Sequence, residues 1–203
     1  MKLIGMLDSP YVRRAAISAK CLGIELAHES VSVFRHFDQF EQINPVVKAP
    51  TLVLDDGEVL MDSTLIIDYL EALAGPGKSL MPAHLNQRVR ALHLIGLALA
   101  ACEKSVQLYY ERNLRPAEIQ FEPWVERVEG QLAAAYSGLE RALEKQPLRT
   151  DGSIDQAGIT LAVAWSFTNL VVPDQVDAGR FPLISAFTAY AEALGVFVST
   201  PIE

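Results

Sequence analysis

The chain has 203 residues, long enough for one medium domain or two small ones with a buried core. Half of its residues are hydrophobic, which excludes a chain that is disordered as a whole. Its 25 acids outnumber its 17 bases and give a net charge of −8. Because phosphate binding needs a concentrated basic face, nucleic acid is excluded as an expected partner.

Neither an export signal nor a membrane span is expected. The apolar run Leu3–Leu7 ends at Asp8, which is too short for an export core. The run Leu94–Cys102 is far below the roughly 20 residues that cross a bilayer. Cys21 and Cys102 lie far apart and form no disulfide framework. We therefore expect a reduced, cytoplasmic protein with no membrane partner.

The first eighty residues alternate strand and helix signals. A short apolar run predicts a strand over Lys2–Leu7. Ser9 and Pro10 are then typical of an N-cap and a first helical residue. Apolar residues at helical spacing follow up to Gly23, which favours a C-terminal stop. A β-rich stretch predicts a second strand over Leu26–Val33.

The residues that follow predict a hairpin and a helix. Two β-rich stretches, Thr51–Leu54 and Glu58–Met61, flank Asp56-Gly57, which is a strong hairpin signal. Ser63 is predicted to cap the next helix. The order β-α-β, a connection, then β-β-α predicts a parallel pair followed by an antiparallel hairpin, in a small mixed sheet with helices on it.

The second half shows helical periodicity only. A Pro/Gly-punctuated segment separates it from the first half and marks a domain boundary. We therefore predict an α/β domain over residues 1–76, a linker over 77–85 and an all-α domain over 86–203. The helices expected in the second domain are Asn86–Asn113, Pro123–Glu144, Asp155–Leu170 and Pro182–Leu194.

Ser9 is a candidate for chemistry because it stands where a strand ends and a helix begins. The free N–H groups and the positive dipole end of a helix N-terminus favour anions, and a hydroxyl there can donate to a thiolate. Such a bond is worth roughly 1.5–3 kcal/mol, which brings a thiol pKa from about 8.5 to near 7. A plain N-cap explains Ser9 as well, and the two roles are compatible.

Two further pairs of residues suit a ligand. The sequence does not show whether the Ala49-Pro50 bond is cis, but in the cis form the Ala49 backbone would turn outward, toward an extended peptide. Ser63 as N-cap would leave N–H groups for a carboxylate, while Asp62 would balance an ammonium group. Together they match the head of an amino acid. Taken singly, each is better explained by helix capping.

No metal site is predicted. The four histidines show no ligand spacing, and two distant cysteines do not complete a zinc site. The segment Gly75–Ser79 resembles the end of a phosphate loop, but Ala72 stands where the first glycine belongs and the segment follows a helix. We therefore reject a nucleotide site there.

Taken together, several short motifs resemble the glutathione transferase family, and the resemblance covers nearly the whole chain. The motifs are Ser9–Arg13, Asn44-Pro45, Lys48–Leu52 and Asp62-Ser63. The resemblance implies a thioredoxin-like N-terminal domain, with helices on a mixed sheet, and an all-α C-terminal domain, usually in a homodimer. It also implies glutathione as cosubstrate and a role in detoxification.

Within that resemblance Ser9 occupies the thiolate-stabilising position. A serine stabilises a thiolate but takes no part in disulfide exchange, which favours conjugation or isomerisation over disulfide reduction. The resemblance assigns the cysteinyl backbone of glutathione to Ala49, with Pro50 in cis. It assigns the γ-glutamyl end to Asp62 and Ser63, and the glycyl carboxylate to Lys48 and Arg35.

The second substrate is expected to be a small, apolar electrophile between Tyr11 and the helix face that carries Val106 and Tyr110. Two alternatives stay open. A glutathione-dependent isomerase of the maleylacetoacetate type is less favoured, because that branch usually has Ser-Ser-Cys where this chain has Asp8-Ser9-Pro10. A non-catalytic interaction module is less favoured, because such relatives often lose the polar residues that persist here.

The chain departs from the family pattern at two positions. The family usually has glycine where Val47 stands. It also tends to carry Ser/Thr-x-x-Asp at the start of a buried helix, where this chain has Asp155 followed by Gly158 three residues later. Asp155 can cap the helix, but Gly158 has no side chain to close the capping box, which puts the local helix stability in question.

Overall fold

The computed structural model describes residues 1–203 and divides them into two compact units. Unit 1 comprises Met1–Leu80 with Leu194–Glu203, and unit 2 comprises Met81–Ala193. The C-terminal residues therefore pack with unit 1, whereas the sequence places them with the helical domain. Hydrogen bonds from Arg13 and Lys20 fasten them to the first helix. Arg13 Nε donates to Thr200 O at 2.9 Å, and Lys20 Nζ donates to Ser199 O at 2.6 Å.

Unit 1 contains a mixed sheet with the strand order β2-β1-β3-β4. β1 pairs in parallel with β2 and antiparallel with β3, and β3 pairs antiparallel with β4. This confirms the parallel pair and the antiparallel hairpin. The strands are shorter than predicted, and their bounds are β1 (Lys2–Ile4), β2 (Ala27–Glu29), β3 (Thr51–Val53) and β4 (Val59–Met61).

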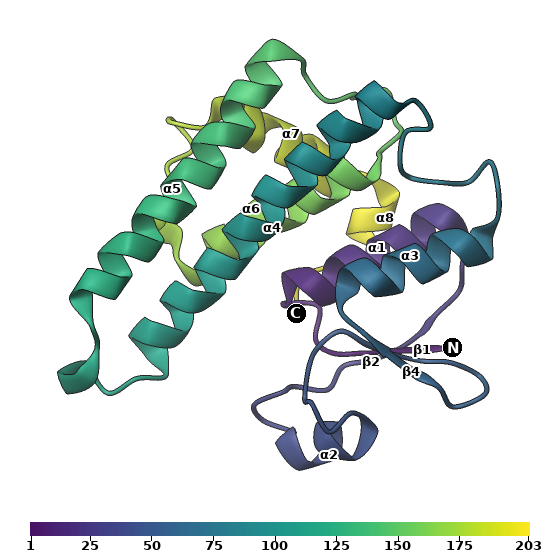
Figure 1. Ribbon diagram of the computed structural model, residues 1–203, viewed down its shortest axis with the longest axis horizontal. Coiled ribbons are helices and arrows are strands. Elements are labelled where there is room, and N and C mark those ends of the chain that lie inside the picture. Colours follow the sequence, from purple (N-terminus) through teal and green to yellow (C-terminus); the bar gives the residue numbers. More distant parts are fainter. The chain divides into compact units, whose positions relative to one another are not determined.

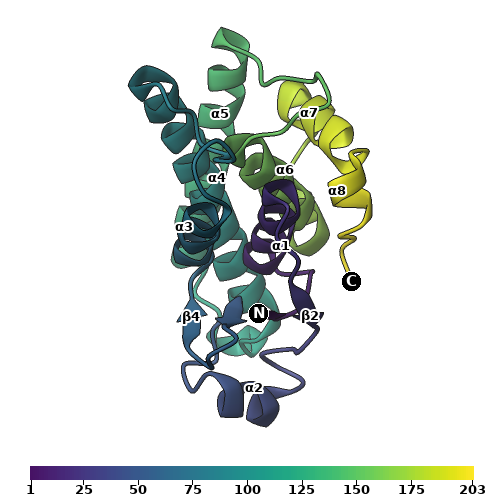
Figure 2. The same cartoon turned by 90° about the vertical axis from the view of Figure 1, so that its right-hand side faces the viewer.

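The helices of unit 1 cover both faces of this sheet. They are α1 (Pro10–Leu22), α2 (Phe37–Ile43), α3 (Ser63–Ala74) and the short α8 (Gly195–Val198). Helices α1 and α3 pack against each other on one face of the sheet, while α2 lies on the other face (Figures 1 and 2). Neighbouring residues of β1 point to opposite faces of the sheet. Leu3 packs in the core under α1 and α3, and Ile4 packs in the core that contains Phe40 of α2.

Two details of unit 1 differ from the prediction. The helix α2 was not predicted, because a helix of seven residues gives too little periodicity to recognise. The second strand ends at Glu29, so the β-rich residues Val31 and Val33 lie beyond it. Val31 is buried against Phe40 instead, and its apolar character serves the core rather than the ladder.

All regular secondary structure of unit 2 is helical, and its long helices begin and end within about two residues of the predicted bounds. They are α4 (Leu85–Asn113), α5 (Glu122–Lys145), α6 (Gln156–Val171) and α7 (Pro182–Glu192), with the 3-10 turns η1 (Ala117–Ile119) and η2 (Pro173–Gln175). By length and composition α4 could cross a membrane, but so could many core helices of soluble proteins, and α4 packs on α5 and α6.

Buried polar groups fix how the helices of unit 2 pack. Thr168 Oγ1 of α6 lies 2.7 Å from Ser105 Oγ of α4 and 2.6 Å from Tyr136 Oη of α5. Burial raises the pKa of Tyr136, so its hydroxyl stays neutral. Glu140 of α5 accepts the backbone N–H groups of Leu183 at 2.8 Å and of Ile184 at 3.1 Å, which caps α7. Each of these hydrogen bonds satisfies a polar group that would otherwise be buried without a partner and would destabilise the fold.

Candidate functional site

The loop between β1 and α1 forms the first part of the site. Gly5 has φ +132°, and a Cβ there would lie 2.7 Å from Val12 Cγ2 and 3.1 Å from Ala49 Cβ. Only glycine permits so close an approach at this backbone angle. Gly5 thereby brings the loop against both α1 and the segment before β3. Sequence analysis did not single it out, because one of the two neighbours that require glycine there, Ala49, is distant in the sequence.

Ser9 follows this loop and is the N-cap of α1. Its backbone is extended, with φ −68° and ψ 124°, and its Oγ accepts from Val12 N at 3.5 Å. The cap that the sequence predicts is therefore confirmed. Capping uses the hydroxyl oxygen as an acceptor, so the O–H hydrogen stays available for a second group. Ser9 is half-buried, at the positive end of the helix dipole.

The segment before β3 forms the second part of the site. The Ala49–Pro50 peptide bond is cis, the form that the resemblance implies. Pro50 is buried, whereas Ala49 is half-buried. No hydrogen bond within the chain uses the backbone N–H or C=O of Ala49. Both groups can therefore pair with an extended backbone that lies beside β3.

Val47 explains one departure from the family pattern. It has φ +51°, in the left-handed region, where a residue with a Cβ is less stable by roughly 1–2 kcal/mol. Glycine is therefore the residue that this backbone position favours. Val47 compensates in part by packing against the core around Phe40.

Asp62 and Ser63 form the third part of the site, and their roles differ from the prediction. The prediction that Ser63 is the N-cap of α3 is wrong. Asp62 caps this helix, with its Oδ1 accepting from Thr64 N at 2.9 Å. The positive φ of Asp62, 73°, turns the chain so that the carboxylate covers the helix end. Ser63 is the first helical residue and is buried.

A buried arginine holds the start of α3 in place. Arg14 of α1 is 2 % exposed, and its Nη1 donates to Ser63 Oγ at 3.0 Å and to Thr64 Oγ1 at 3.2 Å. Sequence analysis did not single out Arg14. Arg14, Ser18 and Leu22 are spaced four residues apart, so they lie on one face of α1, and all three are buried. This spacing is the sequence signal that could have placed Arg14 on the buried face.

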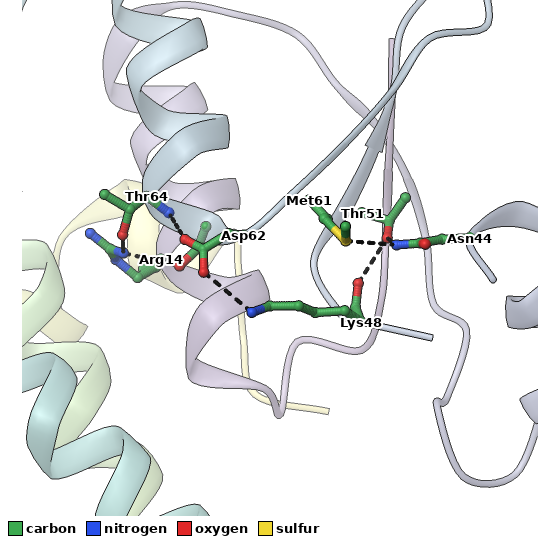
Figure 3. A network of polar contacts seen from close by, with 8 residues as sticks. Arg14, Asn44, Lys48, Thr51, Met61, Asp62 and Thr64 are labelled. Atoms are coloured by element: carbon green, nitrogen blue, oxygen red, sulfur yellow. Dashed lines mark hydrogen bonds and ion pairs between the residues drawn. The ribbon is translucent and has the colours of Figure 1, made fainter. Parts of the chain in front are cut away.

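Lys48 lies beside Asp62, as Figure 3 shows. Its Nζ is 3.4 Å from Asp62 Oδ2. Partial burial on its own raises the pKa of Asp62, but the hydrogen bond from Thr64 and the charges of Lys48 and Arg14 together lower the pKa below its ordinary value. The carboxylate is therefore ionised at neutral pH and can balance an ammonium group.

Two buried polar residues fix the backbone that carries Lys48. Thr51 Oγ1 donates to Lys48 O at 2.8 Å, and Asn44 Nδ2 donates to Thr51 Oγ1 at 2.9 Å (Figure 3). Both residues are nearly fully buried. The Asn44-Pro45 motif thus has a structural role, because it anchors the turn from which Lys48 extends.

Arg35 lies near the loop that precedes Ser9. Its Nη2 is 3.2 Å from Met6 Sδ, and its side chain is exposed. Burial raises the pKa of Asp8 and the nearby Glu203 carboxylate adds to this, while the Ser9 backbone and Arg35 oppose it. Glu203 Oε2 accepts from Leu7 N at 3.4 Å. A cation and two acids therefore flank the loop.

The residues predicted for the second substrate belong to different units. Tyr11 is half-buried in α1 of unit 1. Val106 and Tyr110 lie one turn apart on α4 of unit 2, and burial, with Tyr109, raises the pKa of Tyr110. The pocket that joins them stays a prediction. No group of three or more His, Cys, Asp and Glu residues is arranged to hold a metal ion.

Comparison with known proteins connects this geometry to one family. Residues 3–78 match the family model described as "Glutathione S-transferase, N-terminal domain". The Escherichia coli K12 "Uncharacterized GST-like protein YibF" is 28 % identical over 169 residues, which is 83 % of this chain and 82 % of that protein. These matches show that the chain is similar to glutathione transferases.

Solved structures agree with this result. A glutathione transferase family member from Pseudomonas fluorescens Pf-5, with bound glutathione, is 28 % identical with a TM-score of 0.85, covering 100 % of this chain and 98 % of that one. A bacterial zeta-class protein, maleyl pyruvate isomerase, is 23 % identical with a TM-score of 0.77, covering 98 % and 96 %. This chain has the glutathione transferase fold.

Proposed function

We propose that the protein is a glutathione transferase that activates the glutathione thiol for attack on a small, apolar electrophile in the cytoplasm. The observation that carries the proposal is the chain of contacts in unit 1. Gly5 holds the Ser9 loop against Ala49, and Lys48 reaches Asp62. Arg14 of α1, the helix that Ser9 caps, donates to Ser63 at the start of α3. Two helix N-termini and an unpaired backbone edge thereby belong to one connected site.

Each part of glutathione has a complementary group there. The Ala49 backbone suits the cysteinyl backbone, and the start of α3 suits the γ-glutamyl carboxylate because its N–H groups and the Arg14 charge are positive. Asp62 suits the γ-glutamyl ammonium, and Lys48 or Arg35 suits the glycyl carboxylate. A Pseudomonas relative with the same fold binds glutathione, which supports glutathione as the ligand of this site.

In the proposed reaction Ser9 donates its hydroxyl hydrogen to the glutathione sulfur and stabilises the thiolate. The thiol proton leaves to solvent before the attack. With an activated aromatic chloride as the second substrate, the sulfur forms a bond to the ring carbon, and chloride leaves with its electron pair. The protein's part is to increase the fraction of thiolate and to orient the sulfur.

The proposal is tested by titrating the protein with glutathione in a calorimeter and by following conjugation of 1-chloro-2,4-dinitrobenzene by absorbance. We expect saturable binding of glutathione and a rate above that of the reaction without protein. Failure to bind glutathione contradicts the proposal and supports a non-catalytic interaction module. Binding without conjugation, combined with turnover of maleylacetoacetate, supports the isomerase instead.

We further propose that two copies of this chain form a homodimer. In unit 1 the exposed apolar residues of β4 and α3 include Val59, Met61 and Leu65, the last 64 % exposed. In unit 2 a stripe of exposed apolar residues follows α4 at helical spacing, at Leu85, Val89 and Leu92. A second copy would remove these apolar side chains from water.

Light scattering checks the homodimer. We expect the wild type at twice the 22.3 kDa of the chain, and Leu65→Glu shifted to the monomer mass because the new charge would be buried in the interface. The matched control is Leu170→Glu at a residue of α6 that is 51 % exposed, which should leave the mass unchanged. A wild-type monomer at all concentrations contradicts the proposal.

A further inference from the structure

We infer that Lys48 makes this site selective for ligands that carry both an ammonium group and a separate carboxylate. In the free protein Lys48 occupies the ammonium position on Asp62, and a ligand with both charges replaces it without a net loss of ion pairs. The inference rests on the proposed function, because it concerns how the same site takes glutathione.

Of the two carboxylate oxygens of Asp62, Oδ2 is the one that no backbone N–H group of the helix end occupies. Its Oδ1 accepts from Thr64 N at 2.9 Å and thereby caps α3. Its Oδ2 lies 3.4 Å from Lys48 Nζ. Figure 3 shows the Lys48 ammonium at this oxygen. A ligand ammonium that pairs with Oδ2 therefore approaches the oxygen at which Lys48 already stands.

Lys48 is the group that gives way. Two ammonium groups on one carboxylate oxygen repel each other, and Arg14 already adds a positive charge close by, 3.2 Å from Thr64 Oγ1. The existing ion pair is weak, because the side chains of Lys48 and Asp62 are 50 % and 43 % exposed. The flexible lysine side chain can turn away, whereas Asp62 is held by its capping bond.

The displaced Lys48 ammonium stays close to the site, because its backbone does not move freely. Thr51 and the buried Asn44 hold the Lys48 carbonyl through successive hydrogen bonds of 2.8 Å and 2.9 Å. A ligand carboxylate within reach of that backbone gives Lys48 a new partner. A ligand that has an ammonium group but no carboxylate breaks the Lys48–Asp62 ion pair and leaves Lys48 without an anionic partner. Selectivity for ligands with both charges follows.

The test compares glutathione with its monoethyl ester, which keeps the thiol and the ammonium group but lacks the glycyl carboxylate. Both are titrated calorimetrically into the wild type, into Lys48→Met and into Lys78→Met, a control at an exposed lysine of the same unit. We expect the wild type to bind glutathione about five- to tenfold more tightly than the ester. In Lys48→Met this preference should fall to about one, and the ester should bind roughly two- to fivefold more tightly than to the wild type.

The gain in ester affinity separates this role from a structural one, since damage to the site weakens both ligands. Equal weakening of both ligands in Lys48→Met overturns the inference. An unchanged ester affinity with weaker glutathione binding also overturns it, because Lys48 would then contact the carboxylate without occupying Asp62. If the wild type binds neither ligand, the proposed function itself fails, which is a different result from either of these.

Discussion

Replacing Ser9 by Ala is expected to lower the rate of conjugation at neutral pH by about ten- to 100-fold, because one hydrogen bond to the anionic sulfur is lost. The pKa of the bound glutathione thiol should rise toward its value in free solution. The ultraviolet absorbance of the thiolate, followed against pH in the glutathione complex, measures that pKa directly. The affinity for glutathione should change much less than the rate, because the remaining contacts persist.

Further variants separate this role of Ser9 from capping. Ser9→Gly removes the same hydroxyl, but glycine costs only a few tenths of a kcal/mol at an N-cap, against about 1 kcal/mol for alanine. Both variants should therefore lose rate equally while differing in stability. Ser9→Thr keeps a hydroxyl and should keep most of the rate. Asp155→Ala removes the cap of α6 and should lower stability alone. If Ser9→Ala keeps the wild-type rate and thiol pKa, Ser9 is a cap and nothing more.

The parts of the fold that the sequence predicts well are those with local causes. Ser9 and Gly23 delimit α1 because an N-cap and a left-handed C-cap act within one turn of the helix. Asp56-Gly57 defines the hairpin for the same reason, with Gly57 at φ +90°. The end of β2 has a distant cause. Val31 lies outside the ladder and is buried against Phe40 instead, a contact that no pattern near Val31 indicates.

The same distinction holds for the site. The cap of α3 was misplaced by one residue, because Asp62 and Ser63 are both good caps and the backbone turn at Asp62 decides between them. Arg14 was missed because its partner Ser63 is 49 residues away in the sequence. The contact of Arg13 with Thr200 spans 187 residues, so no local pattern predicts that the C-terminal segment packs on α1.

Restoring the acid at the start of α6 is expected to weaken the protein rather than strengthen it. In Gly158→Asp the new side chain would close the capping box with Asp155, which is worth about 1 kcal/mol. A Cβ at this position, however, would lie 2.9 Å from Phe187 Cζ and 3.0 Å from Ile154 Cγ1. Overpacking typically costs about 1–3 kcal/mol, and burying the carboxylate adds to that cost. We expect a net loss of about 3 kcal/mol or more in the free energy of unfolding, measured by urea denaturation.

Two glycines allow a matched comparison that separates packing from helix propensity. Gly130 lies in α5 with no atom within 4 Å of its would-be Cβ, so Gly130→Ala should stabilise the protein by about 0.5–1 kcal/mol. Gly158→Ala gains the same propensity but meets Phe187, and should destabilise the protein by about 1–2 kcal/mol. The two substitutions are chemically identical, so opposite signs isolate the effect of the Phe187 contact.

Combining Gly158→Ala with Phe187→Leu should recover part of the lost stability, because the smaller side chain makes room for the added methyl group. The two residues are in direct contact, so their effects should not be additive, and the interaction energy of the double-mutant cycle should be about 1 kcal/mol in favour of the double variant. Additive losses in this cycle, or a stabilising Gly158→Ala, contradict this explanation. The departure from the family's capping box would then have a cause other than the packing of α6 on α7.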